Sequence, residues 1–113
     1  MNMIYRLYHN PKCSKSRQAL ALLEIREIEF EEYRYLDMGI KPEDLAIIGK
    51  LKDIIRIGEA EYKTSPIDLE NLQEVSALLQ TSPTLCQRPI LIANGKAIIG
   101  RPPEKILTLL LEA

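Results

Sequence analysis

The stretch that decides the fold spans residues 8–17 and reads YHNPKCSKSR. An apolar run with strand composition precedes it at residues 3–8, and a helical pattern with alanine and leucine on one side follows at residues 16–26. Cys13 is therefore expected where a strand ends and a helix begins. The free N–H groups and partial positive charge of a helix N-terminus stabilise an anion, so the thiol should ionise more readily than free cysteine, whose pKa is about 8.5.

Three cationic residues lie close to Cys13 in the sequence, namely Lys12, Lys15 and Arg17. The common alternative for a cysteine in a small protein is a buried packing role. Proline, lysine, serine and arginine neighbours would make a poor apolar pocket for it. The stretch therefore predicts a reactive thiol beside an anion-binding turn.

Two further residues of this stretch bear on the thiol. His9 lies four residues before Cys13, and it either sets the pKa of the thiol by charge or hydrogen bonding or only fixes the turn. Cys13 and Ser16 form a Cys-x-x-Ser motif, which resembles a redox Cys-x-x-Cys without its second thiol. Serine cannot resolve a mixed disulfide, so electrons for turnover must come from another thiol.

Length and composition predict one soluble globular domain over residues 1–113, with 46% hydrophobic and 27% charged residues. A net charge of −1 indicates neither a nucleic-acid-binding nor a membrane-binding surface. Cys13 and Cys86 are too few and too far apart to suggest a disulfide framework or a zinc site. No leader and no apolar run of about 20 residues is present, so we expect a cytoplasmic protein without a membrane span.

The first elements form the pattern of a parallel βαβ unit. Residues 3–8 read as a central strand, residues 16–26 as a helix and residues 28–35 as a second strand. The alternation of apolar residues changes phase at Tyr33 and Tyr35, which indicates either a bulge or the end of the strand.

A helical region is expected next. Residues 41–51 predict one helix, residues 53–57 a single helical turn, and residues 58–65 a surface loop. Asp68 is then expected to cap a further helix. The apolar stripe of that helix consists of Leu69, Leu72, Val75 and Leu79.

The chain ends with a hairpin and a helix. Residues 90–93 and 96–99 flank Asn94-Gly95, the strongest short signal for a two-residue antiparallel hairpin. A final helix is expected at residues 104–111. The whole order predicts an α/β fold of the thioredoxin or glutaredoxin type, a four-stranded mixed sheet with a helical insertion.

Three arginines are candidate ligands for an oxyanion, because a guanidinium donates parallel hydrogen bonds and stays charged. Arg88 precedes Pro89 at the entrance of a strand, where thioredoxin-like folds keep a cis peptide beside the active thiol. An ordinary loop proline is the alternative. Arg101 follows the hairpin, and Arg56 lies in an apolar stretch. Any one of them alone would more often be a surface residue.

Together, HNPKCSKSR at residues 9–17, RPI at residues 88–90 and GRP at residues 100–102 resemble the motifs of the glutaredoxin-dependent arsenate reductase family. Members of that family use one N-terminal cysteine and three arginines on a thioredoxin-like domain. The matching residues are Cys13 for the nucleophile, His9 for the histidine upstream of it, Arg56, Arg88 and Arg101 for the arginines, and Ser16, Arg17 and Pro89 for supporting positions. Cys86 has no counterpart in the family pattern. It either packs under the loop, which is the more common role of such a cysteine, or forms a disulfide with Cys13 and supplies the resolving thiol that Ser16 cannot.

This resemblance implies reduction of arsenate to arsenite through a covalent cysteine–arsenate intermediate. Glutathione would be the co-substrate and glutaredoxin the partner, with no bound cofactor, no metal and no nucleic acid, and the protein would be a monomer. Two alternatives are a general thiol-disulfide oxidoreductase of the same fold and a non-enzymatic regulator resembling Spx, which binds RNA polymerase. Ser16 in place of a second cysteine, and the set of arginines, favour the enzyme.

Overall fold

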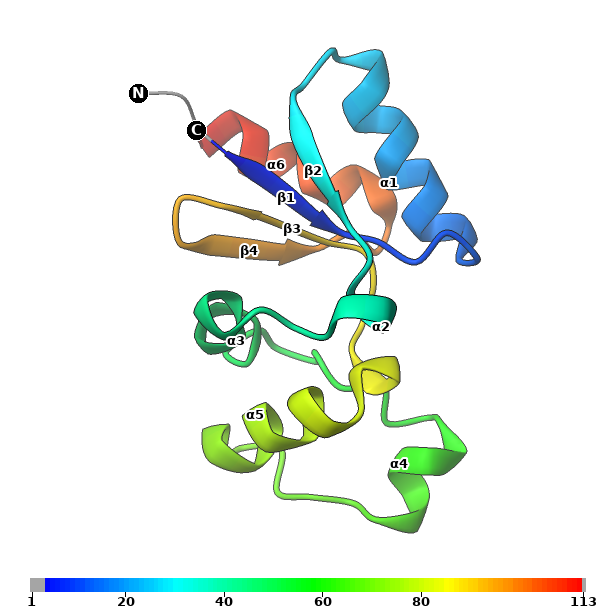
Figure 1. Cartoon of the computed structure of the whole chain (residues 1–113), viewed down its shortest axis with the longest axis vertical. Coiled ribbons are helices and arrows are strands. Elements are labelled where there is room, and N and C mark those ends of the chain that lie inside the picture. Colours follow the sequence, from blue (N-terminus) through cyan, green and yellow to red (C-terminus); the bar gives the residue numbers. More distant parts are fainter. Residues whose placement is uncertain (1–3, 113) are drawn as a thin grey trace.

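The computed structural model describes residues 4–112, and its four strands form one mixed sheet in the order β2-β1-β3-β4 (Figure 1). β1 (Tyr5–Tyr8) pairs in parallel with β2 (Phe30–Tyr33) and antiparallel with β3 (Ile90–Ala93). β4 (Lys96–Ile99) pairs antiparallel with β3 and forms the opposite edge. The predicted four-stranded mixed sheet is confirmed.

The first strand is central, as its apolar sequence predicts, although Met3 of the predicted strand lies outside the described residues. The helix that follows, α1 (Ser14–Ile25), begins two residues earlier than predicted, so that Cys13 becomes its N-cap. The second strand ends at Tyr33, and Tyr35 opens the next helix as a buried residue. The change of phase in the sequence therefore marks the end of the strand.

Two apolar clusters cover the two faces of the sheet. On one face, α1 and α6 (Ile106–Glu112) pack against side chains of β1 and β3. The fully buried residues there include Leu7, Leu23 and Leu91. Tyr8 and Ile90, which neighbour two of these leucines in the chain, face the opposite cluster, as expected from the two-residue period of a strand.

The second face is covered by the helical insertion, which joins β2 to β3 (Figure 1). A buried polar network ties this insertion to the sheet. Asp44 is 3% exposed, and its Oδ2 accepts hydrogen bonds from the Tyr8 hydroxyl at 2.7 Å and from Arg6 Nη1 at 2.8 Å. The insertion is thereby held against the strand that leads into residues 8–17. Its helices are α2 (Tyr35–Met38), α3 (Pro42–Ile48), α4 (Ala60–Thr64), α5 (Leu72–Thr81) and the short 3-10 helix η1 (Pro83–Leu85).

Two predictions within the insertion are wrong. Residues 53–57 form no helical turn: Asp53 has a positive φ of 61°, Ile55 forms an isolated antiparallel bridge with Cys86, and the amide N–H of Gln87 donates to the carbonyl oxygen of Ile54 at 2.8 Å. Residues 58–65 are not only a loop. They contain α4, which is anchored by the buried ring of Tyr62.

The start of α5 also differs from the prediction. Its N-cap is Asn71, whose side-chain oxygen accepts hydrogen bonds from the first turn, whereas Asp68 accepts from Glu70 N in the turn before it. Asn and Asp are equally good N-caps, so the sequence did not distinguish them. Leu69 and Leu72 are consequently exposed. The remaining members of the predicted stripe, Val75 and Leu79, are buried as expected.

The end of the chain follows the sequence closely. Asn94 and Gly95 adopt positive φ angles of 54° and 72°, as a two-residue hairpin turn requires, and the hairpin is confirmed. The 3-10 helix η2 (Pro103–Lys105) precedes α6. Among residues 4–112, none of the helices is long and apolar enough to cross a membrane.

Candidate active site

Cys13 is the N-cap of α1, with a partly exposed side chain and extended backbone angles of φ −96° and ψ 124°. Partial burial of the sulfur raises the pKa of the thiol. The Ser16 backbone N–H, the Arg88 guanidinium and the Lys15 N–H act in the opposite direction and prevail, so that the pKa of Cys13 lies below its ordinary value. This is the direction that a helix N-terminus predicts.

The two late arginines meet at this sulfur. Arg101 Nη2 lies 3.9 Å from Cys13 Sγ, and Arg101 Nε donates to the carbonyl oxygen of Arg88 at 2.9 Å. Because the guanidinium of Arg88 also acts on the thiol, two cations from the open end of the β3–β4 hairpin, one before β3 and one after β4, face one sulfur. A tetrahedral oxyanion beside the sulfur would find both.

Both arginines precede cis-proline peptides. The Arg88–Pro89 bond is cis, as predicted, and the Arg101–Pro102 bond is cis as well, which was not predicted. Gly100 allows these segments to approach closely: its N–H donates to the Pro89 carbonyl at 2.8 Å, and a Cβ at this position would lie only 2.9 Å from Pro89 Cγ. Gly100 therefore sets the spacing between the two arginine-bearing loops.

His9 and Ser16 fix the turn rather than face the sulfur. Both are buried, His9 Nδ1 and Ser16 Oγ share a hydrogen bond of 2.6 Å, and Asn10 N donates to the same Ser16 oxygen at 3.0 Å. Arg17, which is exposed, braces the turn by donating to the Pro11 carbonyl at 2.9 Å. Of the two roles considered for His9, these contacts support the one in which it fixes the turn.

The buried imidazole of His9 should make the free energy of unfolding depend on pH. Burial lowers the pKa of His9 below 6.5, so between that folded-state pKa and about 6.5 the unfolded chain binds a proton that the folded chain does not. We expect the free energy of unfolding to fall with decreasing pH below about 6.5, by at most about 1.4 kcal/mol per pH unit from this group. Urea unfolding at several pH values measures it.

The matched variant is His9→Asn, which keeps a polar atom near the position of Nδ1 but does not titrate. It should show a shallower fall in the free energy of unfolding between about pH 7 and about pH 5. Identical pH profiles for the variant and the wild type would show that His9 is not the titrating group.

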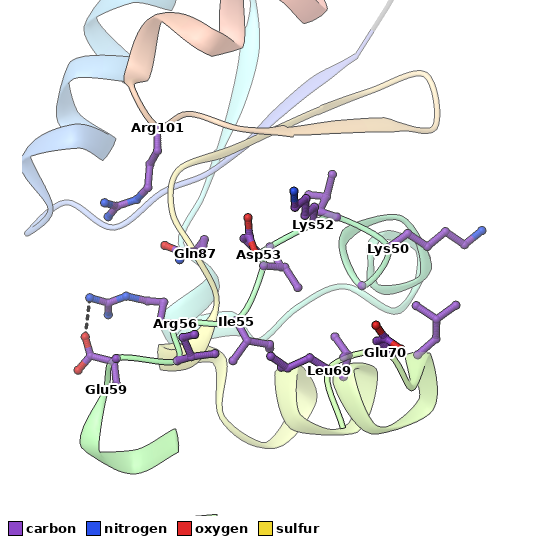
Figure 2. Close-up of a pocket in the computed structure, with 17 residues that line it drawn as sticks. Lys50, Lys52, Asp53, Ile55, Arg56, Glu59, Leu69, Glu70, Gln87 and Arg101 are labelled. Atoms are coloured by element: carbon purple, nitrogen blue, oxygen red, sulfur yellow. Dashed lines mark ion pairs between the residues drawn. The ribbon is translucent and has the colours of Figure 1, made fainter. Parts of the chain in front are cut away.

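Arg56 is held by an ion pair with a neighbouring acidic residue. Its Nη2 forms an ion pair with Glu59 Oε1 at 2.7 Å, and its side chain lines a cavity of about 870 Å³. Figure 2 shows Arg101 and Gln87 at the same cavity, with the Arg56 guanidinium turned toward Glu59. The structure thus brings Cys13, Arg88 and Arg101 together and places Arg56 in the adjoining cavity.

Some residues of this region were not identified from the sequence. Glu59 could have been suspected from its position three residues after Arg56, a spacing at which opposite charges often pair. Gln87 and Tyr35 gave no such signal, since each reaches the region only through the packing of the insertion. Among residues 4–112, no group of three or more His, Cys, Asp or Glu side chains is arranged to hold a metal ion.

Cys86 is fully buried in the apolar cluster. Cys86 and Cys13 are both free cysteines, without a disulfide. Burial raises the pKa of the Cys86 thiol to about 12, so it stays protonated and unreactive at neutral pH. Its surroundings support a packing role.

If the protein reduces arsenate, as the family resemblance implies, we therefore expect Cys86→Ala and Cys86→Ser to keep the wild-type rate of that reaction. The serine variant should unfold at a lower temperature, because a buried hydroxyl replaces a small apolar side chain. Mass spectrometry after one turnover without an added thiol should find no Cys13–Cys86 disulfide. An internal disulfide, together with lost turnover in both variants, would instead make Cys86 the resolving thiol.

Comparison with known proteins places these features in a family. The model of the ArsC family matches residues 8–109. An arsenate reductase of Neisseria meningitidis is 42% identical over 112 residues, which cover 89% of this chain and 93% of the relative. A solved arsenate reductase from Vibrio cholerae superposes with a TM-score of 0.80 at 34% identity, covering 96% of this chain and 98% of the other. A regulatory protein of Bacillus subtilis, MgsR, is 30% identical, with 90% of this chain and 86% of that protein covered. With the thioredoxin-like sheet and the cysteine and arginine motifs in place, the chain belongs to the ArsC family.

Proposed function

We propose that this protein reduces arsenate to arsenite, with Cys13 as the nucleophile. The observation that carries the proposal is the convergence of Arg101 and Arg88 on the sulfur at the N-terminus of α1, with Arg101 Nη2 3.9 Å from it. Such a site attracts a tetrahedral oxyanion and ionises the thiol that attacks it. The names of the Neisseria and Vibrio relatives agree with this substrate.

The first step forms one bond and breaks one. The Cys13 thiolate attacks arsenic, a sulfur–arsenic bond forms, and one oxygen takes up a proton and leaves as water. No electron is transferred in this condensation, so arsenic stays pentavalent. The N–H groups at the start of α1 and the guanidinium groups of Arg88 and Arg101 offset the charge on the remaining oxygens.

The second step needs a thiol from outside the protein. Reduction of arsenic to the trivalent state takes two electrons, which two thiols supply when their sulfurs become a disulfide. Ser16 has no sulfur, and Cys86 is buried and protonated. We assign the second thiol to glutathione. Its thiolate attacks Cys13 Sγ, a sulfur–sulfur bond forms, and the sulfur–arsenic bond breaks with its electron pair left on arsenic, so that arsenite leaves as the mixed disulfide forms. Glutaredoxin then removes glutathione from Cys13.

The cavity beside Arg101 is suited to such a co-substrate. Its lining carries four cationic side chains, Lys50, Lys52, Arg56 and Arg101, against three acidic ones, Asp53, Glu59 and Glu70, together with apolar groups such as Ile57. The cationic side chains would attract the carboxylates of a tripeptide. In this proposal Arg56 binds glutathione or the oxyanion after release from Glu59. The protein works without metal or bound cofactor, as a monomeric domain over residues 1–113, in the reducing cytoplasm where both thiol partners are available.

The test is a coupled assay with glutathione, glutathione reductase, a dithiol glutaredoxin and NADPH. We expect NADPH oxidation that depends on arsenate and on all of the thiol components. Activity with a small disulfide but none with arsenate would identify a general thiol-disulfide oxidoreductase. Inactivity toward both would favour a regulator, as the relationship to MgsR allows.

A further inference from the structure

Two buried polar atoms near the candidate site have no partner. Within residues 4–112, neither the Tyr35 hydroxyl nor Arg88 Nε has a hydrogen bond, although Tyr35 is fully buried. Buried polar groups are almost always paired, and those that are not call for an explanation. Arg88 Nε can only donate, and the Tyr35 hydroxyl would still need an acceptor for its proton even if its oxygen accepted from Nε. An acceptor is therefore missing.

The Tyr35 hydroxyl lies within electrostatic reach of the site. Burial raises the pKa of Tyr35 well above its ordinary value, and charges on Arg88, Arg56 and Cys13 also act on it. The phenol therefore keeps its proton and can only donate to an anion. Tyr35 is the first residue of α2, and α2 contacts η1 just before the segment that carries Arg88 (Figure 1).

The neighbouring tyrosines show what is unusual here. The ring of Tyr8 packs against those of Tyr33 and Tyr35, at centroid distances of 4.8 and 5.9 Å. The Tyr8 hydroxyl donates to Asp44 at 2.7 Å, and the Tyr33 hydroxyl donates to the Gly39 carbonyl at 2.6 Å. The Tyr8 and Tyr33 hydroxyls are thus hydrogen-bonded within the fold, whereas the Tyr35 hydroxyl has no acceptor among residues 4–112.

We propose that the Tyr35 hydroxyl and Arg88 Nε, which are buried in the ligand-free protein, come into contact with the oxyanion when it binds at Cys13 and donate hydrogen bonds to one of its oxygens. This rests on the proposed function, since it concerns the same oxyanion. A tetrahedral oxyanion offers acceptor oxygens in several directions, so Arg101 can hold one side while Tyr35 and Arg88 hold another. Tyr35 is then an oxyanion-binding residue contributed by the helical insertion rather than by the arginine loops.

The experiment compares Tyr35→Phe with Tyr33→Phe, each of which removes one hydroxyl from the same group of stacked tyrosines. Thermal unfolding is measured with increasing concentrations of arsenate. Without arsenate, Tyr35→Phe should unfold at or above the wild-type midpoint, because it loses an unpaired hydroxyl, whereas Tyr33→Phe should unfold lower. Arsenate should raise the midpoints of the wild type and Tyr33→Phe, and Tyr35→Phe should need about 10- to 100-fold more arsenate for the same rise.

Several results would overturn the proposal. One is an equal rise of the thermal midpoint with arsenate in Tyr35→Phe and the wild type, and another is no rise in the wild type. A third is that, without arsenate, the thermal midpoint of Tyr35→Phe falls below the wild-type value by as much as that of Tyr33→Phe. The last would show that a partner such as an ordered water already satisfies the hydroxyl. Slower alkylation of Cys13 by iodoacetamide in Tyr35→Phe would also contradict it, because the hydroxyl would then act on the thiolate. Wild-type protein that binds arsenate but oxidises no NADPH would refute the proposed reduction and leave the role of Tyr35 intact.

Discussion

Cys13→Ser is expected to lower arsenate-dependent NADPH oxidation by more than about a thousandfold, to the background of the assay. A serine hydroxyl does not ionise near neutral pH, and it cannot form the disulfide through which electrons reach arsenic. The fold should be kept, because serine is preferred at the N-cap position that Cys13 occupies. The thermal midpoint should therefore stay the same or rise slightly.

Cys86→Ser is the matched control for this experiment, because it makes the same chemical change at the other cysteine of the chain. It should turn over arsenate like the wild type even though its buried site makes it less stable. Substantial turnover in Cys13→Ser would exclude Cys13 as the nucleophile.

Arg88→Ala and Arg101→Ala are expected to lower kcat/KM for arsenate by about 10- to 1000-fold each, which is the range for losing a donor where charge develops. Arg101 approaches the sulfur to 3.9 Å, and the Arg88 guanidinium also favours the thiolate. Lysine should rescue each position only in part, because an ammonium group does not reproduce the planar fork of arginine. Arg88→Ala should in addition raise the pKa of Cys13, which a pH titration of the thiolate absorbance at about 240 nm would measure.

Arg34→Ala is the control for charge, because Arg34 is exposed and pairs only with the neighbouring Glu32 on the described surface between residues 4 and 112. It should keep normal kinetics. The thermal midpoint of Arg88→Ala should change little, since Arg88 Nε has no partner to lose within that range. Arg101→Ala loses the hydrogen bond from Nε to the Arg88 carbonyl oxygen and should unfold at a slightly lower temperature. If Arg88→Ala failed to fold and Arg101→Ala had normal kinetics, both residues would be structural.

The features that could be predicted from the sequence depend on short-range signals. Asn94-Gly95 specifies a hairpin turn wherever it occurs between two apolar runs, and the cysteine follows a strand and opens a helix within a few residues. Pro89 could be placed at the entrance of a strand for the same reason. These signals were sufficient to predict a four-stranded mixed sheet with a helical insertion.

The features that could not be predicted depend on contacts between distant parts of the chain. Ile55 is extended only because Cys86, 31 positions later in the sequence, supplies its bridge. Tyr35 lies near the candidate site because α2 packs against η1, which comes just before the segment that carries Arg88. Propensity and periodicity do not report such contacts, which is why errors concentrate in the insertion.

The central claim is that arsenate is bound covalently at Cys13 between Arg88 and Arg101, and a crystal structure after soaking with arsenate would test it most directly. Anomalous scattering at the arsenic absorption edge locates arsenic without reference to the protein atoms. We predict one arsenic peak at bonding distance from Cys13 Sγ, with its oxygens contacted by both guanidinium groups and by the Tyr35 hydroxyl. Arsenic found only in the cavity beside Arg56, or at Cys86, would contradict the account.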